Sequence, residues 1–155
     1  MGFDRKAFFG LVRHEVFGGN LSDSAVANME GILDFWFVNH GAKPPAQLAY
    51  VLATVLAEVG RNMAPVREGF SGSDEEAREM LGHRAYAAPA GTYGHSYYGR
   101  GYVQLTWLEN YQRQSDKLGI DFVRYPDKVL ESENALRILV DGMLDGDFNG
   151  DGRKG

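Results

Sequence analysis

The sequence predicts a mainly α-helical fold in a single domain. Apolar residues recur at helical spacing in several segments, and each segment begins at residues that favour a helix N-terminus. The exception is 84–105, which is rich in Gly, Ala and Tyr and lacks a period, so an ordered loop or small β element is expected there. A length of 155 residues suits one domain with its own core, so 1–155 is expected to form one unit.

Three helices are predicted in the first 60 residues. Asp4 is a good N-cap for a helix that ends near Gly18, and Ser22 is a good N-cap for a second helix. The pair at 44–45, Pro-Pro, suits the first turn of a third helix, which runs to Gly60.

Three more helices are predicted further along the chain. Residues 73–76 form a capping box for a short acidic helix that ends near Gly82. Residues 106–109 form a second capping box, which opens a helix that ends near Gly119. Ser132 opens the last helix, which turns apolar residues inward: Leu136, Leu139, Val140, Met143 and Leu144.

The composition argues against several classes of protein. A net charge of −5 is unsuited to nucleic-acid binding, and no apolar run approaches the roughly 18 residues of a membrane span. The absence of Cys excludes disulfides, thiol catalysis and Cys-based zinc sites, and the His residues lack metal-ligand spacing. We therefore expect a monomer with no cofactor, no metal, no nucleic-acid partner and no membrane partner.

The third predicted helix carries the first candidate catalytic carboxylate. Its apolar residues form one buried stripe: Leu48, Val51, Leu52, Val55, Leu56 and Val59. Glu58 falls roughly 20° from Val51, at the edge of this stripe. Its carboxylate is either half inside an apolar neighbourhood, where desolvation favours the protonated form of a general acid, or at a boundary with its head in water.

A second candidate carboxylate follows the end of this helix. Glu68 lies beyond Gly60 and Pro65, where the turning chain can bring it across a cleft from Glu58. The neighbouring Arg67 would favour its ionised form if the two side chains face each other. The alternative is a surface loop in which this Arg-Glu pair has no catalytic role.

Residues 97–111 have the composition of a carbohydrate-binding segment. Aromatic faces stack on the apolar faces of pyranose rings, and amide and hydroxyl groups pair with sugar hydroxyls. The candidate substrate-binding residues are Tyr97, Tyr98, Arg100, Gln104, Trp107, Asn110 and Tyr111.

Three segments, in order, resemble the motifs of the family 19 glycoside hydrolases: 49–68, 98–111 and 142–150. The N-terminal run 4–9 is similar to the bacterial and bacteriophage branch. The family includes chitinases and phage endolysins. The resemblance therefore implies a lysozyme-like helical fold and hydrolysis of a β-1,4-linked amino-sugar polymer.

The resemblance also implies roles for individual residues. Glu58 would be the general acid and Glu68 the general base of a reaction that inverts the anomeric centre. Thr106 would help to hold the attacking water, although it is also a good N-cap without any catalytic role. Gln104 and Asn110 would bind the sugar, or else the backbone of their own loop.

The chain departs from the family pattern beside the proposed acid and at its end. Ala57 and Val59 stand where the family usually has His and Thr, and family members usually continue beyond the third motif. We therefore expect a catalytic domain that is either a compact member of the family or one that lacks a C-terminal portion, with a catalytically silent glycan-binding module as the alternative. Residues 145–152 fit the opening of a calcium-binding EF-hand loop but lack its closing Glu, which favours an acidic turn.

Peptidoglycan is the expected substrate and chitin the alternative. The small size, the absence of Cys and an N-terminus without signal-peptide features favour an endolysin. Such an enzyme is made in the host cytoplasm and acts on the cell wall after release, whereas a chitinase more commonly carries a secretion signal.

Overall fold

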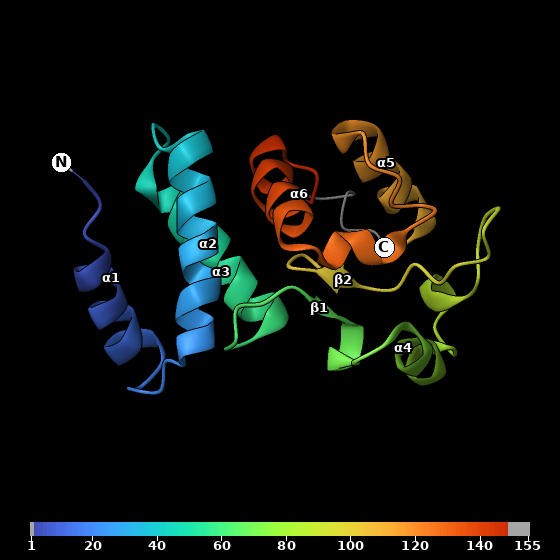
Figure 1. Cartoon of the computed structure of the whole chain (residues 1–155), viewed down its shortest axis with the longest axis horizontal. Helices are drawn as coiled ribbons and strands as arrows, with labels where there is room; N and C mark the ends of the chain where they lie inside the picture. Colours follow the sequence, from blue (N-terminus) through green and yellow to red (C-terminus); the bar gives the residue numbers. More distant parts are fainter. Residues whose placement is uncertain (1, 149–155) are drawn as a thin grey trace.

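Helix α6 (Ser132–Asp145) runs through the middle of the molecule in the computed structural model, which describes residues 2–148. Helices α2 (Asp23–His40) and α3 (Pro45–Val59) lie on one side of it, and α5 (Leu108–Leu118) lies on the other (Figure 1). The predicted mainly helical fold is confirmed, and the arrangement is consistent with a lysozyme-like helical fold.

The predicted N-caps of the first two helices are confirmed. The Asp4 carboxylate accepts a hydrogen bond from the backbone N–H of Ala7 at 2.9 Å, and the Ser22 hydroxyl accepts one from Ala25 at 3.1 Å. Helix α1 (Arg5–Leu11) continues directly into a π-helical turn, η1 (Val12–Val16), which the apolar spacing did not predict.

A two-stranded antiparallel ladder lies below α6 and joins the two sides of the molecule. Strand β1 (Val66–Arg67) pairs with β2 (Arg100–Gly101), which confirms a small β element in the predicted aperiodic stretch. The segment between the strands contains the 3₁₀ turn η2 (Glu68–Phe70), helix α4 (Asp74–Leu81) and the 3₁₀ turn η3 (Ala85–Ala87). A further 3₁₀ helix, η4 (Pro126–Leu130), precedes α6.

The capping box predicted at Thr106 is wrong, whereas the one at Ser73 caps its helix. Ser73 accepts a hydrogen bond from the N–H of Glu76 at 3.1 Å. Helix α5 begins only at Leu108, and its N-cap position is Trp107, which has φ of 71° and makes no side-chain capping bond. The positive φ of Trp107 moves the helix start past Thr106, so the hydroxyl of Thr106 does not cap the helix.

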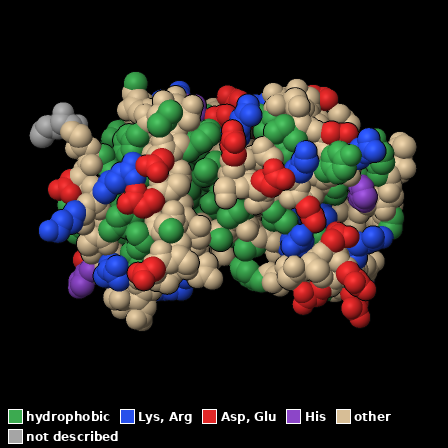
Figure 2. Space-filling view, in the orientation of Figure 1, with side chains coloured by type: hydrophobic (Ala, Val, Ile, Leu, Met, Phe, Trp, Pro, Cys, Tyr) green, Lys and Arg blue, Asp and Glu red, His purple; other side chains and the backbone are tan. Residues whose placement is uncertain are grey.

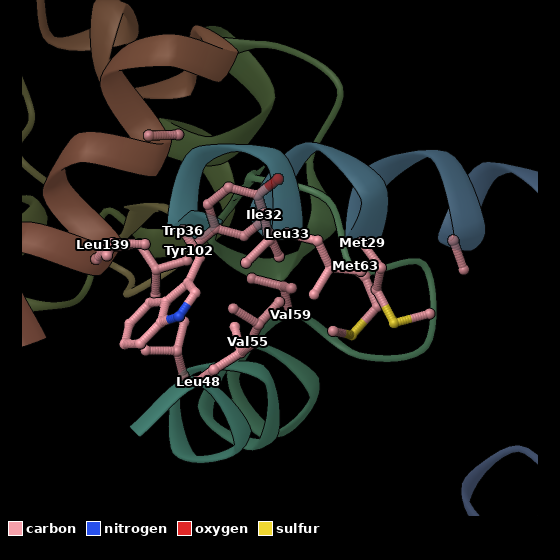
Figure 3. Packing of buried hydrophobic residues seen from close by; sticks show 14 of the residues in the cluster. Met29, Ile32, Leu33, Trp36, Leu48, Val55, Val59, Met63, Tyr102 and Leu139 are labelled. Atoms are coloured by element: carbon pink, nitrogen blue, oxygen red, sulfur yellow. The ribbon is translucent and has the colours of Figure 1, made fainter. Parts of the chain in front are cut away.

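Two buried apolar clusters lie on the two sides of α6. The first joins α2, α3 and α6, and includes Met29, Ile32, Leu33, Trp36, Leu48, Val55, Val59 and Leu139 (Figure 3). The second packs Ile138 of α6 against Tyr97, Leu105, Tyr111, Phe122 and Val129. Burying one such side chain stabilises a fold by about 1.5–3 kcal/mol. Because α6 contributes buried residues to both clusters, it stabilises the packing on both of its sides.

The surface carries charges of both signs, and acidic side chains gather over α4 (Figure 2). This helix has Asp74, Glu75 and Glu76 in its first turn, where carboxylates interact favourably with the positive end of the helix dipole. Among residues 2–148, none of the helices combines the length and apolarity needed to cross a bilayer.

Candidate functional site

The carboxylate of Glu68 is held at the end of the β ladder by hydrogen bonds to both of its oxygens. Oε2 accepts a hydrogen bond from the backbone N–H of Gly99 at 2.9 Å, and Oε1 accepts one from the hydroxyl of Tyr86. The backbone N–H of Glu68 donates in turn to the carbonyl of Gly99 at 2.7 Å. Each carboxylate oxygen has two lone pairs, so both retain capacity to accept a hydrogen bond from water.

Gln104 lies beside Glu68, and Gly99 makes their proximity possible. A Cβ added to Gly99 would lie 2.8 Å from Oε1 of Gln104 and 3.2 Å from Oε2 of Glu68. The amide nitrogen of Gln104 donates to the carbonyls of Val66 and Gly101, at 3.0 and 3.1 Å. These bonds hold Gln104 in a backbone conformation with φ of 54°, which residues other than Gly rarely adopt.

Tyr86 is the residue of this site that the sequence did not indicate. It comes from the 3₁₀ turn η3, in the aperiodic stretch, and has no motif around it. Burial, followed by the hydrogen bond to Glu68, raises the pKa of Tyr86 to about 12. Its hydroxyl therefore remains a proton donor to Glu68 throughout the neutral range.

Arg67 does not face Glu68, contrary to the arrangement considered from the sequence. Its guanidinium donates to Asp127 at 2.8 Å. Successive residues of an extended chain point to opposite faces, and Arg67 pairs across the ladder with Arg100. The two arginines therefore share one face of the ladder, while Glu68 and Gly99 carry the candidate site at the end of the pairing.

Arg100 is part of the core and not a sugar-binding residue in this structure, which corrects the prediction from composition. Its side chain is 1% exposed and forms ion pairs with Asp74 at 3.0 Å and Asp127 at 2.9 Å. Its guanidinium carbon lies 3.7 Å from the centre of the Tyr98 ring. Burial alone would raise the pKa of Asp127, but pairing with Arg67 and Arg100 outweighs it and holds that pKa below its usual value.

Three predicted sugar-stacking tyrosines are also buried, which removes their rings from a ligand's reach: Tyr97, Tyr98 and Tyr111. Their hydroxyls are satisfied internally. Tyr97 donates to the carbonyl of Val123 at 2.7 Å, Tyr98 to Asp74 at 2.8 Å, and Tyr111 to the carbonyl of Tyr98 at 2.7 Å. A phenol whose hydroxyl has a partner can be buried at little cost, so these residues serve as core.

The remaining predicted residues of this segment are half-buried: Gln104, Thr106, Trp107 and Asn110. The Trp107 ring lies edge-on to Tyr86 at 6.1 Å, and its buried indole N–H has no partner among the described residues. The Asn110 amide donates to the carbonyl of Thr106 at 2.8 Å. This bond matches the alternative considered for Asn110, a bond to the backbone of its own loop.

Glu58 is exposed, which matches the alternative of a boundary carboxylate with its head in water and not the half-buried one. It is the penultimate residue of α3, and within residues 2–148 its side chain has no hydrogen-bond or ion-pair partner. The inward positions of the last turns belong to Val55 and Val59, which are 0% and 2% exposed. Their burial turns Glu58 outward and leaves its head group in water.

Two acidic residues at the end of α6 and just beyond it form ion pairs with a lysine. Lys117 pairs with Asp145 at 2.5 Å and with Asp147 at 2.7 Å. Residues 149–152 of the EF-hand-like run lie outside the described residues. Within 2–148, no three or more acidic or histidine side chains converge as metal ligands.

Comparison with known proteins gives one partial similarity. A segment of 59 residues is 37% identical to an endochitinase of Arabidopsis thaliana. The match covers 36% of this chain and 21% of the plant protein, so it spans about a fifth of that relative's length. No family model matches the chain, and no solved structure matches it significantly.

Proposed function

We propose that this chain is a glycoside hydrolase of the endolysin type, which cleaves β-1,4 bonds of peptidoglycan with inversion. The observation that carries the proposal is the Glu68 carboxylate, which is oriented by Tyr86 and Gly99 beside the amide of Gln104. The partial similarity to an endochitinase supports the glycosidase class.

In the proposed reaction, Glu68 takes a proton from a water molecule and Glu58 gives its proton to the leaving glycosidic oxygen. The C1–O bond to the leaving sugar breaks as the bond from C1 to the water oxygen forms on the opposite face. Inversion requires roughly 6.5–9.5 Å between the two carboxyl groups, so that water fits between base and sugar. The two hydrogen bonds to Glu68 limit how far it can move from that position.

The exposure of Glu58 places a condition on this mechanism. A general acid must be protonated before transfer, and desolvation favours its neutral form. Because Glu58 is exposed in the free protein, the bound sugar chain has to supply that desolvation. Gln104, Trp107 and Asn110 are the substrate-binding residues that we retain, with Thr106 proposed to hold the water.

Two alternatives are each favoured by a specific observation. The similarity to a plant endochitinase favours chitin as the polymer. The exposed Glu58, which has no partner among residues 2–148, favours a module that binds glycans without cleaving them.

Release of reducing ends from purified peptidoglycan and from colloidal chitin separates these three possibilities. Release from peptidoglycan alone, with the anomer of inverted configuration seen first by NMR, is the expected result. Release from chitin alone would favour the chitinase. Binding to either polymer without release of reducing ends would favour the silent module and contradict the proposed hydrolase.

A further inference from the structure

A recess lies on the face of the β ladder that carries Arg67 and Arg100, and Glu68 is not part of its lining. It is a cavity of about 410 Å³, within the range of about 300–1,000 Å³ that is usual for small-molecule sites. Arg100 and Asp127 form its inner wall, and His95, Arg124, Tyr125 and Lys128 lie around it. None of these six residues belongs to the set proposed for catalysis.

The walls of this cavity are fixed by hydrogen bonds within the protein. The His95 ring nitrogen lies 2.9 Å from the carbonyl oxygen of Arg124, and the N–H of Arg124 donates to the Asp121 carboxylate at 2.9 Å. The hydroxyl of Tyr97 donates to the carbonyl of Val123 at 2.7 Å. The two chain segments that line the cavity are therefore held together before any ligand binds.

The inner charges of the cavity are already paired. Asp74 and Asp127 both bind Arg100, and Asp127 also binds Arg67. One further carboxylate in the lining, that of Glu131, accepts a hydrogen bond from the side-chain amide of Asn134 at 3.1 Å.

The two outer cations lie over aromatic rings and not beside carboxylates. The Arg124 guanidinium lies 5.9 Å from the ring centre of Tyr93 and 5.2 Å from that of Tyr125. The Lys128 ammonium lies 5.2 Å from the Tyr125 ring centre. Within 2–148, neither cation has a carboxylate within 4.0 Å, so both can still pair with an anion.

The two tyrosines add a platform for an uncharged part of the same ligand. Tyr93 and Tyr125 are 46% and 47% exposed, whereas four other tyrosines are buried: Tyr97, Tyr98, Tyr102 and Tyr111. Tyr93 is stacked on His95 with an angle of 20° between the rings, which steadies its orientation. A sugar ring or a short peptide can lie against such faces while its carboxylate reaches the cations.

We propose that this cavity binds the carboxylate-bearing part of a peptidoglycan fragment, through Arg124 and Lys128, with Tyr93 and Tyr125 against the attached sugar or peptide. The choice of peptidoglycan as ligand rests on the proposed function, whereas the preference for an anion rests on the cavity itself. Chitin carries no carboxylate, so occupation of this site favours the wall polymer.

Muramyl dipeptide is a suitable probe, since it joins one N-acetylmuramoyl sugar to a peptide with one free carboxylate. NMR titration of the full chain should give saturable shifts for backbone amides near 93–95 and 124–128. The same compound with its carboxylate amidated should bind at least tenfold more weakly. Equal binding of the acid and the amide, or no binding of the acid, would overturn the proposal.

The double variant Arg124→Gln/Lys128→Gln should lose at least tenfold in affinity for muramyl dipeptide. A matched double variant, Lys6→Gln/Arg113→Gln, removes two exposed cations elsewhere and should bind as the wild type does. Unchanged affinity in the cavity variant would contradict the site.

The variant Glu68→Gln separates this inference from the proposed function, because Glu68 lies outside the cavity lining. It should bind muramyl dipeptide normally while losing hydrolysis. If the wild-type protein binds the probe but releases no reducing ends, the proposed binding site is supported and the proposed hydrolase activity is contradicted. If the protein hydrolyses peptidoglycan but does not bind the probe, the proposed hydrolase activity is supported and the proposed binding site is contradicted.

Discussion

Tyr86 donates a hydrogen bond to Oε1 of Glu68, although eighteen positions separate them in the chain. The other oxygen of this carboxylate is held by the backbone N–H of Gly99, on the neighbouring strand segment. Three distant parts of the chain thus define the orientation of one carboxylate. This orientation is the feature on which the proposed general base depends.

Removal of the Tyr86 hydroxyl should lower turnover more than binding. A hydrogen bond to a charged group contributes about 1.5–3 kcal/mol, and each 1.4 kcal/mol is about a tenfold change in rate. We therefore expect Tyr86→Phe to lower kcat for peptidoglycan hydrolysis by about 10- to 100-fold, with KM changed by less than about twofold. Steady-state kinetics on solubilised peptidoglycan measure both values.

A matched control for this variant is Tyr50→Phe, since Tyr50 is 58% exposed on α3. It should leave kcat and the melting temperature unchanged. If Tyr86→Phe keeps the kcat of the wild type, Tyr86 is not a positioning residue for Glu68.

A methyl group at Gly99 should disturb the two polar side chains of the site together. In Gly99→Ala, the new Cβ would lie 2.8 Å from Oε1 of Gln104 and 3.2 Å from Oε2 of Glu68, so one or both must move. Activity should fall at least tenfold while circular dichroism still reports the helical fold. Full activity would contradict the close packing of these residues.

The control for Gly99→Ala is Gly31→Ala, within α2. A Cβ at Gly31 would meet nothing within 4 Å, and Ala favours a helix over Gly by about 0.5–1 kcal/mol. This variant should keep its activity and unfold at an equal or higher temperature.

Loss of the Arg100 side chain should appear in the free energy of unfolding. Arg100→Ala leaves Asp74 and Asp127 without their shared partner and empties a position that is 1% exposed. Breaking a buried ion pair costs about 3–5 kcal/mol, and the lower end is expected because both aspartates are partly exposed.

Urea denaturation of Arg100→Ala and of the exposed control Arg113→Ala measures this difference. The control should change the unfolding free energy by less than about 0.5 kcal/mol. If Arg100→Ala kept the stability of the wild type but lost affinity for the polymer, Arg100 would be a substrate residue after all.

The sequence predicts the helices well because their signals are local. Asp4 and Ser22 cap the first two helices as expected, and Pro45 opens α3. Thr106 fails as a cap because Trp107 has a positive φ and the helix begins after it. A capping pattern in the sequence does not reveal such a backbone conformation. The π-helical turn at 12–16 was likewise not predictable from local sequence patterns.

The candidate site is less predictable, because its residues meet only through the ladder. Composition indicated Gln104, the position of Glu68 beyond the end of the third helix indicated that carboxylate, and the structure places both beside Gly99. Composition did not reveal that Tyr97, Tyr98 and Tyr111 have internal hydrogen-bond partners, which makes them core. Composition also gave no indication of Tyr86, because the sequence around this tyrosine has no motif or period from which its contacts could be predicted.

Alkaline pH should destabilise the fold through buried tyrosines. Burial raises the pKa of Tyr86, Tyr98 and Tyr102 to about 12, whereas an unfolded chain releases these protons near about 10. The unfolded state therefore binds fewer protons in this window, and stability falls as pH rises through it.

Urea denaturation at a series of pH values measures this loss. The unfolding free energy should be independent of these groups below about pH 10 and should fall between about pH 10 and 12. Tyr102→Phe should make that fall shallower, since burial alone shifts its pKa. A free energy that stays constant across the window would contradict the assignment.

Release of reducing ends from purified peptidoglycan by Glu68→Gln is the most direct test of the central claim. General acid–base groups contribute roughly 10²–10⁴-fold to rate. The variant should lose activity by that amount while still sedimenting with the polymer, and the exposed control Glu79→Gln should remain active. Hydrolysis at the wild-type rate by Glu68→Gln would contradict the proposed role of Glu68 as the general base.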